Sequence, residues 1–582
     1  MGGGFFPLNE VHKGLKGTAW TVFTGSQPES MEVEILGVLR GARGPGHDMI
    51  LAQLHGAKPE YTGVVAGMSG SPVYIGNRLL GSLSYRIGQF SKDPIAGITP
   101  IEQMLEVRDL PDQGLGTGGL GTKEQSAETM MQAMETPLVM GGFHPEAVRL
   151  WQREMAGTGL EMIAAGGMSG ASEGGGADYA PSAEAIAGIE PGSAVSAELV
   201  RGDLEISATC TVTYVDPKQL LACGHPILQA GPVSLPMTAT EVVATVASPL
   251  NAFKIVNTGA TIGAFNEDRD AAVRGVLGAR ARMIPVHIRV HGTGGEAGSQ
   301  GEADSRKVER RLNVEILDLP SLTPQAVLVT LYESLLESNE STAEMSYHLT
   351  GKIDLEGYTA APLNLWAPAT DAGAAPVQLA LEAGEAFQRL YANGSRLGAV
   401  HAIDLDVEEI PRRMEVELDA ARVISGNIVH AGDTVVVEAA LRPWRQPERN
   451  LRIAVKLPAR LGAGNLRLLV SDAGTLDRTL NQPRQQNHEM EMTAVLAQAK
   501  NQHAEDRIYV SVLVPETQAG MAGQTLSSLP LSMANVLEPL RPSQDASLNG
   551  ESVELEADAP AGGVLSGFQL LNLRIEPGGG LN

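Results

Sequence analysis

The sequence predicts a mainly β protein in which two β-barrel modules precede C-terminal β-sandwich or α+β domains. Its 582 residues exceed what one hydrophobic core holds together, so several domains are expected. Glycine is frequent (67 residues) and aromatic residues make up only 4%, which favours turns and small-residue strands over a helical bundle. Strand-length apolar runs, separated by Gly, Pro, Asn and Ser, recur at the spacing of a small barrel or sandwich.

These runs divide the chain into six segments, of which the two barrels are the first and the third. Residues 111–200 are expected to be a helical and Gly-rich linker, with helices at 126–134 and 145–155. The alternating pattern of residues 414–535 predicts an immunoglobulin-like sandwich. The predicted segments are a serine-bearing barrel (1–110), the linker (111–200), a histidine-bearing barrel (201–310), an α+β or sandwich module (311–413), the immunoglobulin-like sandwich (414–535) and a tail with one late strand (536–582).

Charge and hydropathy exclude several function classes. The net charge of −25 would repel nucleic acid and anionic lipid, and no basic cluster offsets it. No run of about 20 apolar residues predicts a membrane span. The N-terminus lacks the basic start and apolar stretch of a secretory signal. Either the chain is cytosolic or an export signal was removed before this sequence begins, and we expect the latter.

A glycine-serine motif between two apolar runs is the strongest candidate for chemistry. It reads Gly-Met-Ser-Gly-Ser-Pro at residues 67–72. Glycines allow unusual backbone dihedrals, so amide N–H groups can converge on one point. A hydroxyl beside such donors suits acyl transfer, while a plain Gly/Ser hairpin is the alternative. Ser71 is a rival nucleophile, and Ser69 is preferred because it lies between the glycines.

The sequence Gly224-His225-Pro226, at the end of a strand-length run, is the second candidate. A lone histidine near a strand end is more often a surface or core residue. Here it follows small residues and precedes a proline at the rim of the second barrel, so its ring can face a cleft. With Ser69 across an interface, His225 has the arrangement of a general base. That hypothesis requires Ser69 Oγ within hydrogen-bond reach of an imidazole nitrogen.

Two cysteines, Cys210 and Cys223, flank an Asp-Pro turn signal at residues 216–217. A symmetric hairpin would place them directly opposite each other, about 4.5 Å apart at Cα in a non-hydrogen-bonded pair, which is within disulfide range. Two buried free thiols are the equal alternative. A disulfide would indicate an oxidising compartment.

Three stretches together resemble the bacterial SpoIVB-type serine peptidases (peptidase family S55). They are 'GTAWTVFTGSQPESMEVEILGVL' (17–39), 'TGVVAGMSGSPVYIGNRLLGSLSY' (62–85) and 'TCTVTYVDPKQLLACGHPI' (209–227). The resemblance covers residues 9–110 and roughly 190–300. It implies a chymotrypsin-like fold with Ser69 as nucleophile and His225 as general base.

By the same resemblance, the N–H groups of Gly67 and Ser69 would form the oxyanion hole. Residues Ser82, Leu83 and Ser84 would be the strand along which an extended substrate pairs by β-augmentation.

The chain departs from this family in three respects. Its serine module precedes its histidine module, and no PDZ domain is recognisable. The window that should hold the family's acid, residues 53–56, has no carboxylate. Asp268, downstream of the histidine in the same barrel, is the chosen third member, with Asp270 and Asp48 as other candidates. A Ser/His dyad also stays open.

The sequence therefore predicts a periplasmic or secreted serine endopeptidase of the cell envelope that acts on a protein substrate, with the chain itself among the candidates. No cofactor is expected, and the twelve histidines show no metal-ligand spacing. The alternative is a non-catalytic peptide-binding or assembly protein that keeps the protease fold. The C-terminal domains are the expected contact for an envelope protein partner.

Overall fold

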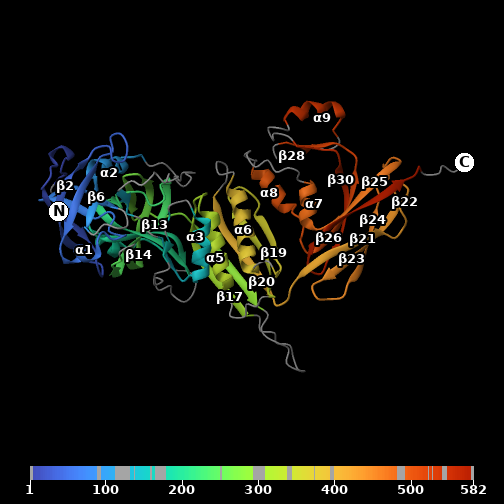
Figure 1. The fold of residues 1–582 in the computed structure, drawn as a ribbon, viewed down its shortest axis with the longest axis horizontal. Helices are drawn as coiled ribbons and strands as arrows, with labels where there is room; N and C mark the ends of the chain where they lie inside the picture. Colours follow the sequence, from blue (N-terminus) through green and yellow to red (C-terminus); the bar gives the residue numbers. More distant parts are fainter. Residues whose placement is uncertain are drawn as a thin grey trace, which may run out of the picture. The chain divides into compact units, whose positions relative to one another are not determined.

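The fold of the chain is shown in Figure 1, a computed structural model of all 582 residues. The chain divides into two compact units, one made of Met1–His287 and Leu312–Glu333, the other of Ile288–Arg311 and Ser334–Asn582. The structure describes residues 4–87, 93–111, 131–134, 136, 138–156, 160, 162–163, 179–248, 252–292, 308–336, 344–371, 374–392, 399–480, 492–521, 524–526, 529–540 and 547–577.

The first six strands of the chain form a closed antiparallel barrel. They are β1 (Lys16–Thr21), β2 (Glu29–Leu39), β3 (Met49–His55), β4 (Pro72–Ile75), β5 (Arg78–Ile87) and β6 (Ile95–Pro100). Their order around the barrel is β1-β2-β3-β6-β5-β4, and β4 pairs back onto β1. In β2 the alternation places Met31, Val33 and Ile35 in the core and the intervening glutamates outward, as a half-buried strand requires.

Short helices accompany this barrel, and one of them leads into the glycine-serine motif. They are η1 (Leu8–Glu10), α1 (Ala57–Thr62) and α2 (Ile101–Arg108). Helix α1 follows β3, and the motif connects it to β4.

A second closed antiparallel barrel repeats the same topology. Its strands are β10 (Ala194–Gly202), β11 (Glu205–Val215), β12 (Gln219–Ala222), β13 (Gly231–Val246), β14 (Phe253–Arg269) and β15 (Ala272–Leu277). Their order is β10-β11-β12-β15-β14-β13, with β13 paired back onto β10. In both barrels the strands therefore follow the order first, second, third, sixth, fifth, fourth. The second barrel begins at Ala194, ahead of the predicted boundary at 201, because β10 is needed to close it.

The segment between the barrels contains strands as well as helices. Its elements are β7 (Met131–Ala133), β8 (Leu138–Gly141), α3 (Pro145–Glu154), β9 (Met162–Ile163) and α4 (Ala183–Ala187). Helix α3 lies where the sequence predicts a helix. The helix predicted over 126–134 is wrong at Met131–Ala133, which is a strand paired with β5. Residues 126–130 lie outside the described part.

After the second barrel come β16 (Met283–Gly292), β17 (Val308–Leu317) and α5 (Thr323–Leu336). In the second unit, α6 (Ala375–Tyr391) packs on β19 (Ala361–Ala367) and β18 (Ser346–Leu355), which with β20 (Val400–Ile410) are three neighbouring antiparallel strands of a larger sheet. This part is an α+β module.

A sandwich of two sheets completes the second unit. One sheet has the order β24-β23-β21-β31, the other β22-β32-β25-β26-β30, and both contribute to one apolar core. The strands are β21 (Glu415–Val423), β22 (Ile428–Val429), β23 (Thr434–Pro443), β24 (Arg449–Lys456), β25 (Gly464–Ser471), β26 (Arg507–Val514), β30 (Ser552–Pro560), β31 (Val564–Ser566) and β32 (Phe568–Ile575). Strands β30, β31 and β32 come from the segment predicted as a tail with one late strand, so that prediction is wrong: the tail is part of the sandwich.

The remaining elements are short. They are α7 (Ala473–Leu480), α8 (Met492–Lys500), β27 (Gln518–Met521), β28 (Gln524–Leu526), α9 (Leu531–Leu537), η2 (Glu538–Leu540) and β29 (Ser547–Asn549).

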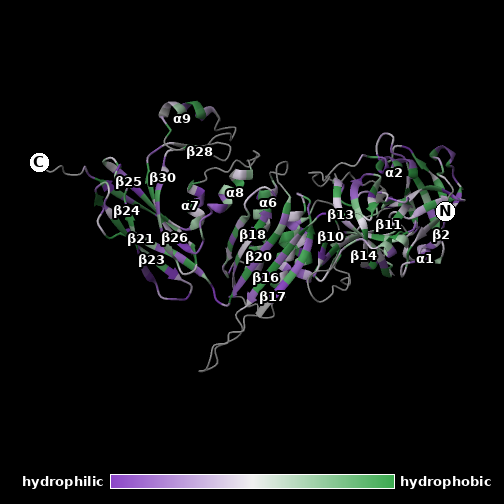
Figure 2. Ribbon diagram, turned by 180° about the vertical axis from the view of Figure 1, so that it is seen from behind, coloured by the Kyte–Doolittle hydropathy of each residue, from purple (hydrophilic) through white to green (hydrophobic). Residues whose placement is uncertain are grey.

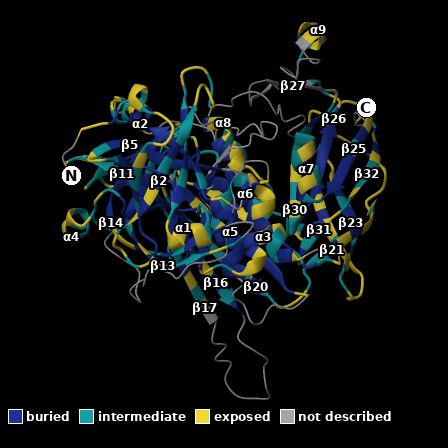
Figure 3. Cartoon of the chain, turned by 60° about the vertical axis from the view of Figure 1, so that its left-hand side comes forward, coloured by how far each residue is buried: buried dark blue, intermediate teal, exposed yellow. Residues whose placement is uncertain are grey.

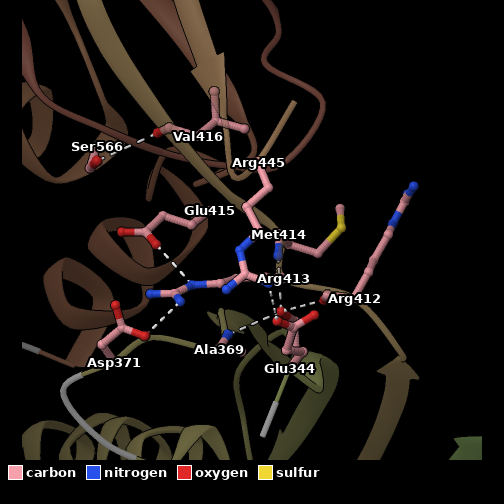
Figure 4. A network of polar contacts seen from close by, with 11 residues as sticks. Glu344, Ala369, Asp371, Arg412, Arg413, Met414, Glu415, Val416, Arg445 and Ser566 are labelled. Carbon is pink, nitrogen blue, oxygen red and sulfur yellow. Dashed lines mark hydrogen bonds and ion pairs between the residues drawn. The ribbon is translucent and has the colours of Figure 1, made fainter. Parts of the chain in front are cut away.

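A polar network joins the α+β module to the sandwich (Figure 4). Arg413, between β20 and β21, forms ion pairs with Asp371 (2.9 Å) and Glu415 (3.1 Å) and lies over the ring of Trp444. The Ser346 hydroxyl donates to the Arg412 carbonyl. The same oxygen accepts the backbone N–H groups of Ala369 and Met414. These bonds fix the chain where it passes between the two modules.

Apolar residues are spread over the strands of every sheet (Figure 2), and exposed residues gather on short helices such as α4 and α9 (Figure 3). Within the described ranges, the helices include none that is both long and apolar enough to cross a membrane.

Candidate functional site

The loop that carries Ser69 is held by its own backbone. Gly67 (φ 95°) and Gly70 (φ 100°) take left-handed conformations that favour glycine. The Ser71 hydroxyl donates to the Met68 carbonyl at 2.6 Å, and the Ser71 N–H donates to the same oxygen. The rival serine is therefore engaged in holding the turn. Ser69 Oγ is fully buried, and none of the described residues is hydrogen-bonded to it.

The predicted oxyanion donors, Gly67 and Ser69, differ from their neighbours in their hydrogen bonds. The N–H groups of Met68, Gly70 and Ser71 all donate to backbone carbonyls. In the described part of the chain, no backbone carbonyl accepts from the N–H of Gly67 or of Ser69. Donors without a backbone partner are what an oxyanion hole requires, and the role of these two N–H groups in such a hole stays a prediction.

His225 lies in the loop between β12 and β13 and is 1% exposed. Its Nδ1 is 2.8 Å from the carbonyl oxygen of Pro226. Because a carbonyl oxygen only accepts, this bond requires the proton on Nδ1. In the neutral imidazole, Nε2 then carries the lone pair, which is the tautomer that a general base needs.

Asp268, at the end of β14, is fully buried beneath the His225 loop. Its two carboxylate oxygens accept the N–H groups of Ile227 and Leu228 at 2.8 and 2.6 Å. Burial raises the pKa of Asp268, and these backbone donors oppose the rise. These hydrogen bonds make Asp268 a support of the loop, and its role as the acid facing the imidazole stays a prediction.

The other two candidate acids form ion pairs with arginines instead. Asp270 pairs with Arg43, and Asp48 pairs with Arg40 and accepts the Gly41 N–H, which lowers the pKa of Asp48. Both are ordinary ion-pair partners, and neither is connected to His225 by these contacts.

Strand β11 of the second barrel brings the Ser69 loop against the His225 loop. The Thr211 N–H donates to the Ser69 carbonyl at 2.7 Å, and the Thr211 carbonyl accepts the Cys223 N–H at 3.3 Å. Gly70 packs so closely here that a Cβ on it would lie 1.7 Å from the Thr211 oxygen. One residue of β11 thus contacts both loops.

The contact is reciprocal, because the His225 loop also packs on the first barrel. A Cβ on Gly224 would lie 2.4 Å from Ser82 Oγ and 2.0 Å from Ser84 Oγ. The Gly224 carbonyl accepts a hydrogen bond from Thr99 Oγ1 at 2.7 Å. Two glycines, one in each loop, let the two backbones approach.

The two loops occupy equivalent positions in the two barrels. Each connects the third strand of its barrel to the fourth. The hydrogen bond between Ser69 and His225 is not formed, since no described residue bonds to Ser69 Oγ. Catalytic hydrogen bonds are often long before substrate binds, so the proximity of the loops is the relevant observation.

The two cysteines form a disulfide with a Cα–Cα distance of 5.1 Å. They are not directly opposed, as the symmetric hairpin would require. The register of β11 and β12 shifts between Val212 and Tyr214, and Cys223 takes a left-handed conformation (φ 68°). The disulfide therefore ties β11 to the residue two before His225.

The predicted substrate strand, Ser82 to Ser84, is buried and already paired. Leu83 bonds through both its N–H and its carbonyl to the Ser69 loop, to Ser71 and Gly70 respectively. Pairing of a substrate at Leu83 is therefore excluded in this state. At Ser84 the carbonyl accepts the N–H of Met134 at 2.8 Å.

Lys254, on β14, is a site residue that the sequence analysis missed. Its amine donates to the Gly67 carbonyl (3.1 Å) and to Thr21 Oγ1 (2.9 Å), and its stem packs on Gly67. Complete burial lowers its pKa to about 7. Both acceptors are uncharged, so no opposite charge in these contacts stabilises the ammonium form. A single lysine in an apolar strand gives no sequence signal for this role.

The lowered pKa of Lys254 predicts a pH-dependent stability. Between pH 7 and 10.5 the unfolded chain binds a proton at this lysine that the folded chain does not, so the stability falls as the pH falls from 10.5 to 7. We expect Lys254→Met to remove this dependence and to gain about 4 kcal/mol relative to wild type at pH 7. Denaturant unfolding at pH 7 and pH 10 measures it.

The exposed Lys218, substituted by methionine, is the matched control, and its stability should follow wild type at both pH values. A Lys254→Met protein with the wild-type pH dependence would contradict the assignment.

Searches of protein-family models, of curated proteins and of solved structures find no match to this chain.

Proposed function

We propose that this protein is a serine endopeptidase that cleaves extended protein segments through an acyl-enzyme. The observation that carries the proposal is the meeting of two equivalent barrel loops, one bearing Ser69 and the other His225, at Thr211. The resemblance to SpoIVB-type peptidases, carried by three stretches that include both loops, supports the same reaction.

In the proposed reaction, His225 Nε2 accepts the proton of Ser69 Oγ as the oxygen attacks the substrate carbonyl. The N–H groups of Gly67 and Ser69 stabilise the resulting oxyanion. The imidazolium then donates its proton to the leaving amine, and the acyl-enzyme remains. Water, activated by His225, hydrolyses the ester and regenerates Ser69. The Pro226 carbonyl keeps the proton of Nδ1 in place throughout.

A fluorophosphonate probe tests the nucleophile, because it reacts covalently with activated serines. We expect the full-length protein to be labelled and Ser69→Ala to lose the label. Ser71→Ala is the matched control: it removes a hydroxyl two residues away and should keep the label. Labelling that survives Ser69→Ala would contradict the proposal, and loss in Ser71→Ala alone would assign the rival serine.

A second function is favoured by one observation. Ser69 is fully buried and not bonded to His225. A non-catalytic peptide-binding or assembly protein that keeps this architecture would have the same features. A folded wild-type protein that is never labelled, yet binds peptide, would support this second function.

We propose an extracytoplasmic location, in the periplasm or secreted. The disulfide between Cys210 and Cys223 supports it, because disulfides persist in oxidising compartments. The sandwich and the α+β module of the second unit are proposed to contact an envelope protein partner.

A further inference from the structure

The described strands of the segment between the two barrels pair with one strand of each barrel near the candidate site. Strand β7 pairs antiparallel with β5, with Ala133 opposite Tyr85. Five residues later, β8 pairs antiparallel with β11 of the second barrel, with Leu138 opposite Ala208. The chain thus leaves one barrel and joins the other within a few residues.

Met134 is the last described residue of this segment on the first barrel. Its N–H donates to the Ser84 carbonyl at 2.8 Å. Its side chain is fully buried in the apolar cluster of the first barrel, which also includes Val65, Met68 and Leu83. Met68 precedes the candidate nucleophile, so Met134 and the Ser69 loop contribute side chains to the same apolar cluster.

Thr136 lies on the second barrel. Its side chain is 8% exposed, and Thr136 Oγ1 is 3.9 Å from Cys210 Sγ. That sulfur is bonded to Cys223, at the start of the His225 loop.

The Ser69 loop contacts β5 and β11 at residues next to those that Met134 and Thr136 contact. It bonds to Leu83 on β5 and to Thr211 on β11. Met134 and Thr136 contact the next residue on each strand, Ser84 and Cys210. The described part of the segment therefore lies beside the nucleophile loop, and β7 pairs with the strand through which an extended substrate would pair.

We propose that the described residues between Met131 and Gly141 occupy the substrate groove of this same chain as an intramolecular substrate mimic. The groove then selects peptides with an unbranched apolar side chain, such as methionine, at the position of Met134. This inference rests on the proposed function for the identity of the groove. It accounts for the pairing of the Ser84 carbonyl with the Met134 N–H.

The apolar cluster around Met134 explains the selectivity. Burial of a methionine side chain removes apolar surface from water, which favours binding. An aspartate at the same position would have to be desolvated without a partner among the apolar side chains of the cluster. A peptide with aspartate there should therefore bind much more weakly.

A peptide-binding experiment tests the mimic without requiring catalysis. The probe is a synthetic peptide of residues 129–138, and its matched control carries aspartate in place of Met134. The protein is the full chain with Ser69→Ala, either alone or combined with Met134→Asp, which weakens the internal occupant. We expect the double variant to bind the methionine peptide at least tenfold more tightly than Ser69→Ala alone, and more tightly than it binds the aspartate peptide. Equal binding of the two peptides, or no gain in the double variant, would overturn the proposal.

Met134→Ala, which adds no charge to the core, provides a second variant in case Met134→Asp does not fold. Combined with Ser69→Ala, it should increase the affinity for the methionine peptide in the same direction, and an unchanged affinity would count against the proposal. With Ser69 present, Met134→Ala should be labelled faster by fluorophosphonate than wild type. If no variant is labelled but the methionine peptide still binds selectively, the proposed peptidase activity is rejected. The proposal that the chain occupies its own groove would then stand.

Discussion

Replacement of His225 by glutamine is expected to lower peptide hydrolysis by about 10⁶-fold, the loss typical when the histidine base of a serine protease is removed. Glutamine preserves the approximate size of the side chain but cannot accept and return the proton of Ser69. The expected loss lies in kcat, because the imidazole acts in the chemical step rather than in binding.

The measurement is steady-state hydrolysis of a peptide with methionine at the position of Met134. His287→Gln, at an exposed histidine on β16 in the same unit, is the matched control and should retain wild-type rates. A His225→Gln enzyme with wild-type kcat would remove His225 from the mechanism, whatever the labelling of Ser69.

Replacement of Gly70 by alanine is expected to destabilise the first unit by more than about 4 kcal/mol, a cost reached only by severe packing or backbone conflicts. A Cβ at Gly70 would lie 1.7 Å from the Thr211 carbonyl oxygen and 2.7 Å from the Cys223 nitrogen. Both atoms are backbone, so no side-chain rotation relieves the overlap. The left-handed conformation of Gly70 adds about 1–2 kcal/mol.

Denaturant unfolding measures the loss of stability. The rate at which fluorophosphonate labels Ser69 reports whether the Ser69 loop keeps its conformation. Gly76→Ala is the matched control, because Gly76 also has a positive φ (61°) but has nothing within 4 Å of a Cβ. It should lose only about 1–2 kcal/mol, the conformational cost alone. Equal losses at the two glycines would mean that the close packing between the Ser69 loop and β11 is not maintained in solution.

Most strands of the two barrels were predictable as strand-length apolar runs between turn residues, whereas β10 was assigned to the linker. In β2 the pattern of Met31, Val33 and Ile35 between glutamates suffices to assign a strand and its buried face. The same local argument failed for Met131–Ala133, whose run of small and unbranched residues suits a helix. Pairing with β5 decides its conformation, and that partner lies far away in the sequence.

The C-terminal segment was misjudged for a related reason. The sequence analysis expected only the late strand, which is β32; the alternating residues of β30 were passed over in a mostly polar segment, and β31 is only three residues long. They become strands because β26, β21 and β25 offer edges for pairing.

For the candidate site, the sequence alone determined the chemically capable residues: a serine between two glycines, a histidine after a glycine, and two cysteines around a turn. Each depends on residue type and immediate neighbours, which a sequence states directly. Only the tertiary structure decided which groups these residues contact. It placed the Pro226 carbonyl at the histidine, Asp268 under the loop, Lys254 behind Gly67 and Met134 beside Ser84. Such contacts join residues from different strands and different barrels, and their formation depends on barrel closure and packing that no local pattern encodes.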